Sequence, residues 1–267
     1  MSTGPNACRL EGRHAVVTGA GSGIGRAIAH RLASEGARVS LMGRRALALE
    51  ETAAGAAGTF AILPCDVRDA DGTRAAMAAA AAAHGPIHVA VANAGAGGPN
   101  GPGFQPGDQP DRFDDLVATN LAGTYHTFRG ALDHLAEDGG ASRHLVAVAS
   151  ILARIGVMGY TGYCASKAGV TGLCRAFAAE LAPRDIQVNA VAPGWVETQM
   201  AWEGLDGMAT GLGITRDDAL ALAMNDVPLG RMGQPEEIAG MVAWLVSADA
   251  RGVTGQTLDM NGGAFML

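Results

Sequence analysis

The sequence lacks the clusters and spacings of side chains that typically bind nucleic acids or metals. Its basic residues cluster only at Arg44-Arg45, and the formal net charge is −7. We expect no nucleic acid as the main partner, because neutralising phosphates requires clustered Lys and Arg. The seven histidines show no paired spacing and no H-E-x-x-H motif. We therefore also expect no bound metal.

Cysteines and long apolar runs are scarce as well. The four cysteines form no C-x-x-C pair, and a chain of 267 residues is large enough to fold without disulfides, so reduced thiols are expected. No apolar run approaches the roughly 18 to 20 residues of a membrane span. Residues 1–10 lack the apolar core of a signal peptide. These absences predict a cytoplasmic protein with no membrane partner and a loose N-terminal tail over residues 1–11.

What the chain does contain is a regular alternation of short apolar runs and longer helical segments. Hydrophobic residues make up 48% and charged residues 17%, as in globular proteins. The runs are apolar nearly throughout, as strands buried on both faces are. The expected strands are His14–Thr18, Arg38–Met42, Thr59–Pro64, Ile87–Ala92, His144–Ala149, Ile186–Ala192 and Gln256–Met260. The expected helices include Gly23–Glu35, Ala70–His84, Asp111–Ala136, Tyr160–Leu181 and Pro235–Ser247.

This rhythm predicts an α/β fold, a doubly wound parallel seven-stranded sheet with helices on both faces (Rossmann-like), in a single domain over residues 1–267. Two segments interrupt the rhythm. Residues 96–110 are rich in Gly and Pro and are expected to form a loop, and residues 198–226 form an insertion. Ligands of such sheets bind beyond the carboxyl ends of the strands. Because both segments follow strands, both are candidate walls of a substrate site.

A glycine-rich turn follows the first expected strand. Gly19, Gly23 and Gly25 open the next helix, where glycines permit a tight turn and close approach of a dinucleotide pyrophosphate. The helix N-terminus adds free N–H groups and a dipole that favours anions. The spacing is G-x-x-x-G-x-G rather than G-x-G-x-x-G. An ordinary strand–helix turn is the alternative.

The corner after the second strand bears on the choice of cofactor. An acidic residue normally binds the adenosine ribose of NAD there, but the chain has Gly43 followed by Arg44 and Arg45. An arginine can bind the 2′-phosphate of NADP through paired hydrogen bonds. The corner therefore favours NADP, with NAD as the alternative if the two arginines only solvate the next helix. Ser22 supplies no second cation for the phosphate.

Two further strand ends carry polar or small residues. Asp66 can accept a hydrogen bond from an adenine amino group, or it can cap the following helix. Asn93-Ala94-Gly95 follows the fourth strand. Gly95 would let the backbone approach a cofactor, and the alternative is a simple turn.

A serine, a tyrosine and a lysine follow in the second half of the chain. Ser150 ends a strand, and Tyr163 and Lys167 lie four residues apart, so they share one helix face. A free phenol has a pKa near 10. A neighbouring ammonium and a nicotinamide cation would lower the pKa of Tyr163, which suits a group that exchanges a proton near neutral pH.

Together these motifs resemble the short-chain dehydrogenase/reductase family in its compact single-domain form. The resemblance covers nearly the whole chain and includes Thr18–Gly25, Asp66, Asn93–Gly95, Asn120, Ser150, Tyr163-x-x-x-Lys167 and Pro193–Thr198. It implies a catalytic tetrad of Asn120, Ser150, Tyr163 and Lys167. Tyr163 would be the general acid/base and Ser150 would bind the substrate oxygen. Lys167 would hold the nicotinamide ribose and lower the Tyr163 pKa, and Asn120 would fix a water that links Lys167 to solvent.

The same resemblance implies a set of cofactor contacts. The backbone near Pro193, Gly194, Val196 and Thr198 would hold the nicotinamide carboxamide. The full expected set is Gly19, Ser22, Gly23, Ile24, Gly25, Arg44, Arg45, Asp66, Val67, Asn93, Ala94, Gly95, Tyr163, Lys167, Pro193, Gly194, Val196 and Thr198.

The resemblance also implies an activity and an assembly. It is nearest to 3-oxoacyl-thioester reductases and polyketide ketoreductases, so a small-molecule carbonyl or secondary-alcohol substrate and NADP are expected. The alternatives are an NAD-linked secondary-alcohol dehydrogenase and a non-catalytic cofactor-binding subunit. A homotetramer is expected, formed through helices 111–136 and 160–181 and the C-terminal segment.

Overall fold

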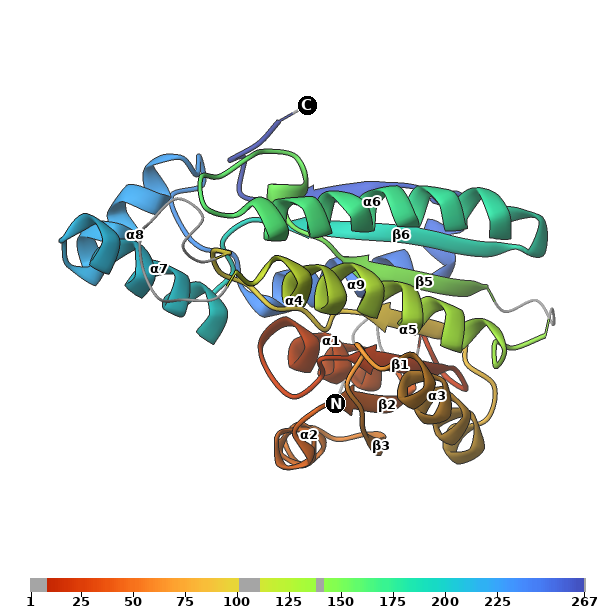
Figure 1. The fold of residues 1–267 in the computed structure, drawn as a ribbon. Coiled ribbons are helices and arrows are strands. Elements are labelled where there is room, and N and C mark those ends of the chain that lie inside the picture. The colour runs from red at the N-terminus through yellow and green to blue at the C-terminus, as the bar shows by residue number, and fades with distance from the viewer. Residues whose placement is uncertain (1–8, 101–110, 138–141, 267) are drawn as a thin grey trace.

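The computed structural model describes residues 9–100, 111–137 and 142–266, and their strands form one parallel sheet (Figure 1). The strand order is β3-β2-β1-β4-β5-β6-β7, with every pairing parallel. This confirms the predicted doubly wound α/β fold. The strands are β1 (His14–Thr18), β2 (Arg38–Gly43), β3 (Thr59–Pro64), β4 (Val89–Ala92), β5 (Arg143–Val148), β6 (Ile186–Pro193) and β7 (Thr257–Met260).

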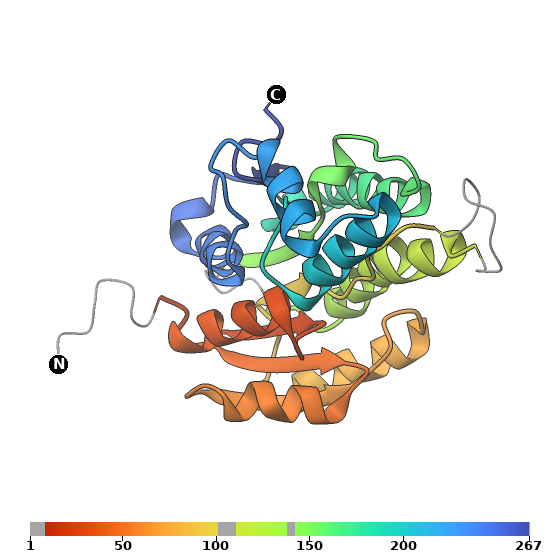
Figure 2. The ribbon, with the colours of Figure 1, turned by 90° about the vertical axis from the view of Figure 1, so that its left-hand side faces the viewer.

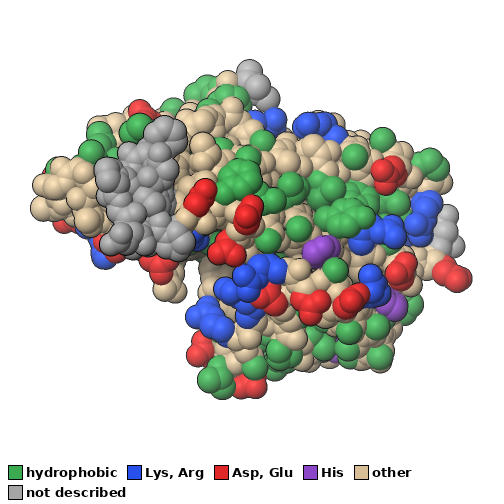
Figure 3. Space-filling view, in the orientation of Figure 1, with side chains coloured by type: hydrophobic (Ala, Val, Ile, Leu, Met, Phe, Trp, Pro, Cys, Tyr) green, Lys and Arg blue, Asp and Glu red, His purple; other side chains and the backbone are tan. Residues whose placement is uncertain are grey.

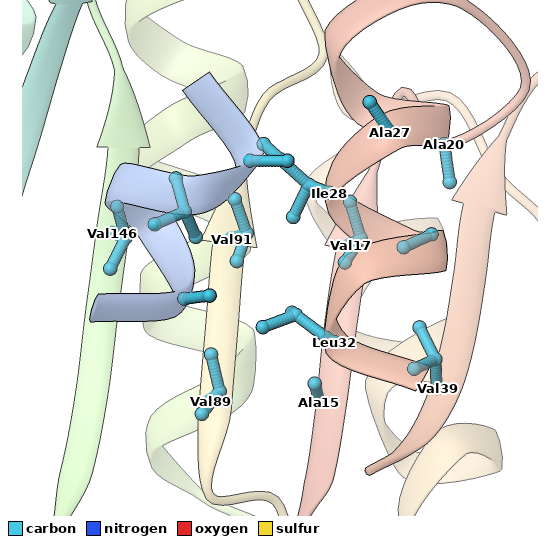
Figure 4. Packing of buried hydrophobic residues seen from close by; sticks show 14 of the residues in the cluster. Ala15, Val17, Ala20, Ala27, Ile28, Leu32, Val39, Val89, Val91 and Val146 are labelled. Atoms are coloured by element: carbon cyan, nitrogen blue, oxygen red, sulfur yellow. The ribbon is translucent and has the colours of Figure 1, made fainter. Parts of the chain in front are cut away.

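Two helical layers cover the two faces of the sheet. Alternate residues of β1 enter different apolar clusters: Ala15 and Val17 pack on one face, and Val16 on the other. Figure 4 shows Ile28 and Leu32 reaching from their helix toward the strands of the first face. That face is covered by α1 (Gly23–Ser34), α2 (Ala46–Ala54) and α9 (Pro235–Leu245). The second face is covered by α3 (Ala70–His84), α5 (Gly123–Leu132) and α6 (Thr161–Leu181).

The carboxyl ends of the strands meet at the end of the sheet where two further helices lie. The insertion folds as α7 (Gln199–Leu212) and α8 (Arg216–Asn225), which extend past the strands on the left of Figure 1 and face the viewer in Figure 2. They pack on each other through a small apolar cluster that includes Leu205 and Ala223. The strand order reverses between β1 and β4, which is where such sheets bind ligands.

The predicted single helix over residues 111–136 is wrong. It is divided into α4 (Phe113–Val117), a π-helical turn η1 (Ala118–Ala122) and α5. Such a turn inserts an extra residue and is frequent at functional sites. It contains Asn120, whose side chain bonds outside its own helix. The predicted loop 96–110 is described only through Asn100, and the rest lies outside the described residues.

The predicted loose tail is wrong for its last three residues. Leu10 is fully buried, and its N–H donates to the carbonyl of Glu35 at 2.8 Å. Arg9 donates two hydrogen bonds to the Glu35 carboxylate, each 3.0 Å long. An apolar side chain and an ion pair therefore fasten this segment to the end of α1. Residues 1–8 lie outside the described residues.

Candidate active site

The glycine turn between β1 and α1 has a backbone that only glycines can form. Gly19 and Gly23 have φ of +64° and +50°, in the left-handed region. A Cβ at Gly25 would lie 2.2 Å from the Gly19 carbonyl oxygen. Ser22 is the N-cap of α1, yet its side chain makes no capping hydrogen bond. The first N–H groups of α1 are thus left for another acceptor, such as a pyrophosphate oxygen.

Asn93 fastens the end of β4 to this turn. Its Nδ2 donates to the carbonyls of Thr18 and Gly19 at 3.0 and 3.3 Å. The Thr18 hydroxyl in turn accepts from the N–H groups of Asn93 and Ala94, both at 3.1 Å. Asn93-Ala94-Gly95 is therefore more than a simple turn. The amide nitrogen of Asn93, a residue predicted to contact the cofactor, bonds the turn backbone.

Two residues that the motifs did not indicate form hydrogen bonds with the turn backbone, Thr52 from α2 and Arg26 from α1. Thr52 is fully buried, and its hydroxyl lies 3.0 Å from the Ala20 carbonyl. Arg26 donates to the Gly21 carbonyl at 2.7 Å and to the Thr52 hydroxyl at 3.1 Å. These contacts join segments that are distant in sequence. The only available signal was an arginine directly after Gly25.

The corner after β2 presents two arginines, Arg44 and Arg45. Their side chains are exposed and form no hydrogen bond or ion pair among the described residues. Asp66, at the end of β3, pairs with Arg68 at 2.7 Å. Arg68 is the main cause that lowers the Asp66 pKa, and Arg44 lowers it further. Basic and acidic side chains lie side by side in the lower left of Figure 3.

The alternative role of Asp66 as a helix cap is wrong. Asp69 is the N-cap of α3, and its carboxylate accepts from the N–H groups of Asp71 and Gly72. Asp66 therefore lies before the helix, where its carboxylate bonds Arg68 and the backbone N–H of that residue.

Ser150, Tyr163 and Lys167 are brought together at the carboxyl end of β5. Ser150 follows β5 and is buried. Its hydroxyl is close enough to the phenol of Tyr163, which lies in the first turn of α6, to influence the pKa of that phenol. The Lys167 ammonium lies 5.7 Å from the centroid of the Tyr163 ring. The predicted trio therefore forms one cluster around the Tyr163 side chain.

The expected lowering of the Tyr163 pKa by the ammonium is wrong in this structure. Burial raises the pKa of Tyr163, and the nearby Ser150 hydroxyl only partly opposes that rise. Lys167 donates to the carbonyl of Val148 at 2.8 Å rather than to the phenol. Burial also lowers the pKa of Lys167 to about 8, so its charge is held less firmly than that of an exposed lysine.

Asn120 joins the loop after β4 to α6. It is fully buried, its Oδ1 accepts from the Ala96 N–H at 2.8 Å, and its Nδ2 donates to the Ser166 hydroxyl at 3.1 Å. A Cβ at Gly95 would lie 3.2 Å from Asn120 Oδ1 and 3.5 Å from Lys167 Nζ. The four members of the predicted tetrad thus meet around Gly95 and the first turn of α6. The water-binding role implied for Asn120 stays a prediction.

The residues predicted to hold the nicotinamide follow β6. Gly194 donates to the Met260 carbonyl at 3.1 Å, and a Cβ there would lie 3.0 Å from the Asn261 Cα. Thr198 caps α7, and its Cγ2 would lie 3.1 Å from a Cβ at Gly23. The segment after β6 therefore lies beside the glycine turn. The other members of the predicted set are placed as follows: Pro193 ends β6, Val196 and Val67 are buried, and Ile24 packs on the core.

Residues 9–100, 111–137 and 142–266 contain neither a candidate metal site nor a candidate membrane span. In these ranges, no three His, Cys, Asp or Glu side chains gather as a metal site. No helix in the same ranges is long and apolar enough to cross a membrane. The expected cytoplasmic location stays a prediction.

Known proteins resemble this chain over almost its whole length. A family model described as enoyl-(acyl carrier protein) reductase matches residues 19–264. The 3-oxoacyl-[acyl-carrier-protein] reductase FabG of Vibrio harveyi is 34% identical, over 97% of this chain and 99% of that protein. The (3R)-3-hydroxyacyl-CoA dehydrogenase of Mus musculus is 34% identical, over 97% and 98%.

A solved structure extends this similarity to three dimensions. A phenylalanine-to-tryptophan variant of actinorhodin polyketide ketoreductase, solved with NADPH, is 36% identical and superposes with a TM-score of 0.86, covering 97% of this chain and 98% of that one. Fold, motifs and relatives agree over the whole length. The chain belongs to the short-chain dehydrogenase/reductase family and is an NAD(P)-dependent oxidoreductase.

Proposed function

We propose that the protein is an NADP-preferring reductase that transfers hydride between the nicotinamide and a carbonyl or secondary alcohol, with a 3-oxoacyl or cyclic ketone as substrate. The observation that carries the proposal is the clustering of Ser150, Tyr163 and Lys167 at the carboxyl end of β5. The 3-oxoacyl reductase and polyketide ketoreductase relatives support the substrate class.

The residues present fit a dinucleotide. The glycine turn leaves no room for a Cβ at Gly25, and the first turn of α1 is uncapped by Ser22. The side chains of Arg44 and Arg45 are exposed and form no hydrogen bond or ion pair within the described residues, so a 2′-phosphate at this corner would accept their hydrogen bonds. Asp66 and the backbone of Val67 would hold the adenine, and Gly95 and the segment from Pro193 to Thr198 would hold the nicotinamide side.

Each catalytic residue would have a separate role in the reduction of the carbonyl. The bound nicotinamide supplies the hydride. The Ser150 hydroxyl would hold the carbonyl oxygen, and the Tyr163 phenol would give that oxygen its proton. Lys167 would bind the nicotinamide ribose. Asn120 would keep the loop after β4 against α6 and link Lys167 to solvent.

Nicotinamide absorbance with a panel of ketones tests the proposal. The panel contains 3-oxoacyl thioesters, cyclic ketones and simple aliphatic ketones, each with NADPH and with NADH. Oxidation of NADPH by a ketone is expected. Turnover only with NAD and an alcohol would favour the NAD-linked dehydrogenase. Cofactor binding with no turnover of any ketone or alcohol would favour a non-catalytic subunit.

We also infer a homotetramer built on α5, α6 and the C-terminal segment, through side chains that the chain leaves exposed on these elements. Leu116, Phe128 and Val170 are fully buried within the chain. The exposed apolar residues on this side include Tyr125, at 45%, and Figure 3 shows hydrophobic side chains over the same face. A Tyr125→Arg variant should dissociate the tetramer in light scattering at micromolar concentration. A monomeric wild-type protein would refute the assembly.

A further inference from the structure

Both the backbone and the side chain of Asn100 form hydrogen bonds that connect the start of α4 with the start of α6. Its backbone N–H donates to the Gly159 carbonyl at 2.8 Å, and its carbonyl accepts from the Arg112 N–H at 2.7 Å. Its Oδ1 accepts from the Gly162 N–H at 2.6 Å, and its Nδ2 donates to Asp111 at 3.3 Å. The residue is only 8% exposed. Buried polar groups that are all satisfied in this way specify one local arrangement.

On one side, Asn100 caps the helix that carries the tyrosine. The N-cap of α6 is Tyr160, whose side chain makes no capping hydrogen bond. The first N–H groups of a helix need such an acceptor, which is normally the N-cap side chain itself. Here Asn100 supplies it from 62 positions earlier in the chain, to Gly162. Tyr163 is the next residue.

Gly162 lets this contact form. A Cβ at that position would lie 2.8 Å from Asn100 Oδ1 and 3.1 Å from the Cα of Phe113. Contacts below 3.0 Å would force a shift of the amide or of the helix. The glycine therefore allows the loop and the start of α4 to press against the first turn of α6.

On the other side, Asn100 reaches the helix that leads to Asn120. Asp111, which accepts from Asn100, also accepts from the Phe113 N–H at 2.9 Å at the start of α4. α4 continues directly into the π-helical turn that contains Asn120. One side chain thus links the segments that carry two members of the tetrad.

We propose that Asn100 is a positioning residue for the reaction. By capping α6 from the loop after β4, it fixes the position of the Tyr163 phenol relative to Ser150 and the substrate oxygen. This rests on the proposed role of Tyr163. The expected effect is on the chemical step rather than on cofactor binding, because none of the four contacts of Asn100 is with a residue of the glycine turn or the adenosine corner.

The test compares Asn100→Ala with a matched buried asparagine. Asn189 on β6 is 1% exposed and bonds the Val253 carbonyl at 2.8 Å and the Gln256 N–H at 3.0 Å, away from α6's first turn. Asn100→Ala should slow single-turnover hydride transfer by about 10- to 100-fold, as a small displacement of a catalytic group does, with an unchanged Kd for NADPH. Asn189→Ala should lower stability and leave that rate unchanged.

Two further variants probe the same hydrogen bond. Asn100→Asp combined with Asp111→Asn keeps an acceptor for the Gly162 N–H and a donor–acceptor pair between the two side chains, and should restore much of the rate lost in Asn100→Ala. In Gly162→Ala the added Cβ would crowd Asn100 Oδ1, so this variant should slow the chemical step while NADPH still binds. The test therefore does not depend on whether Asn100→Ala folds.

Tyr163→Phe, measured in parallel, separates the two proposals. If Tyr163→Phe keeps full turnover, the proposed function fails. If Tyr163→Phe is inactive while Asn100→Ala and Gly162→Ala transfer hydride at the wild-type rate, only the role of Asn100 is refuted. A loss of NADPH affinity equal to the loss of rate would also refute it, because a general structural defect would then account for both.

Discussion

The Lys167 ammonium donates a hydrogen bond to the carbonyl of Val148, the last residue of β5, at 2.8 Å. Ser150 lies two residues further along the same backbone. The bond therefore fixes α6 relative to the serine and places the ammonium beneath the Tyr163 ring. The ammonium is buried at this place, and burial lowers the pKa of Lys167 to about 8.

The lowered pKa of Lys167 can be measured directly, because Lys167 is the only lysine in the chain. In protein labelled with nitrogen-15 lysine, the single side-chain amine should titrate near pH 8 instead of near 10.5. Nuclear magnetic resonance follows the titration, and the signal should vanish in Lys167→Arg. An amine that titrates like an exposed lysine would contradict the burial described above.

Cofactor preference should depend on the corner after β2. A hydrogen bond to a charged group contributes roughly 1.5–3 kcal/mol, so Arg44 should favour NADPH by about 10- to 150-fold in kcat/KM. Gly43→Asp with Arg44→Ile should reverse the preference, although a Cβ at Gly43 lies 3.3 Å from Leu49 Cδ2 and that side chain must move slightly. Arg44→Ile alone should lose the NADPH preference without gaining NADH activity. Equal kcat/KM values for both cofactors in the wild type would mean that the two arginines do not select between NADPH and NADH.

Two buried histidines should make the fold sensitive to mild acid. Burial lowers the pKa of His14 to about 4 and that of His144 to about 3. The unfolded chain takes up these protons near pH 6.5, so stability is full above that pH and falls as the pH drops toward the folded values. Between pH 6.5 and 5 each histidine should cost about 2 kcal/mol of unfolding free energy.

Urea unfolding at pH 7.5 and pH 5 measures this loss. The carboxylates with lowered pKa values, such as Glu35 and Glu237, stay ionised over that range and do not contribute to it. A variant with His14→Gln and His144→Gln should show a flatter dependence on pH. An equal slope in the variant and the wild type would assign the acid sensitivity to other groups.

The sequence was enough to predict the strands of the sheet and the candidate site residues. It was not enough to predict the hydrogen bonds that connect those residues. Apolar runs such as Ala15-Val16-Val17 indicate strands buried on both faces. The glycine turn could be predicted because its backbone has no room for a side chain. The bonds of Asn93, Thr52 and Asn100 join segments far apart in the chain, so no local spacing indicates them. The π-helical turn at Asn120 was missed because its apolar pattern resembles that of an ordinary helix.

The central claim is that the Tyr163 phenol gives its proton to the substrate oxygen, and Tyr163→Phe tests it most directly. The variant keeps the ring and its packing but removes the hydroxyl. With NADPH and the best ketone of the panel, its turnover should fall by at least about 100-fold, the lower end of a general-acid contribution, while NADPH binds as tightly as in the wild type. Wild-type turnover in Tyr163→Phe would contradict the account.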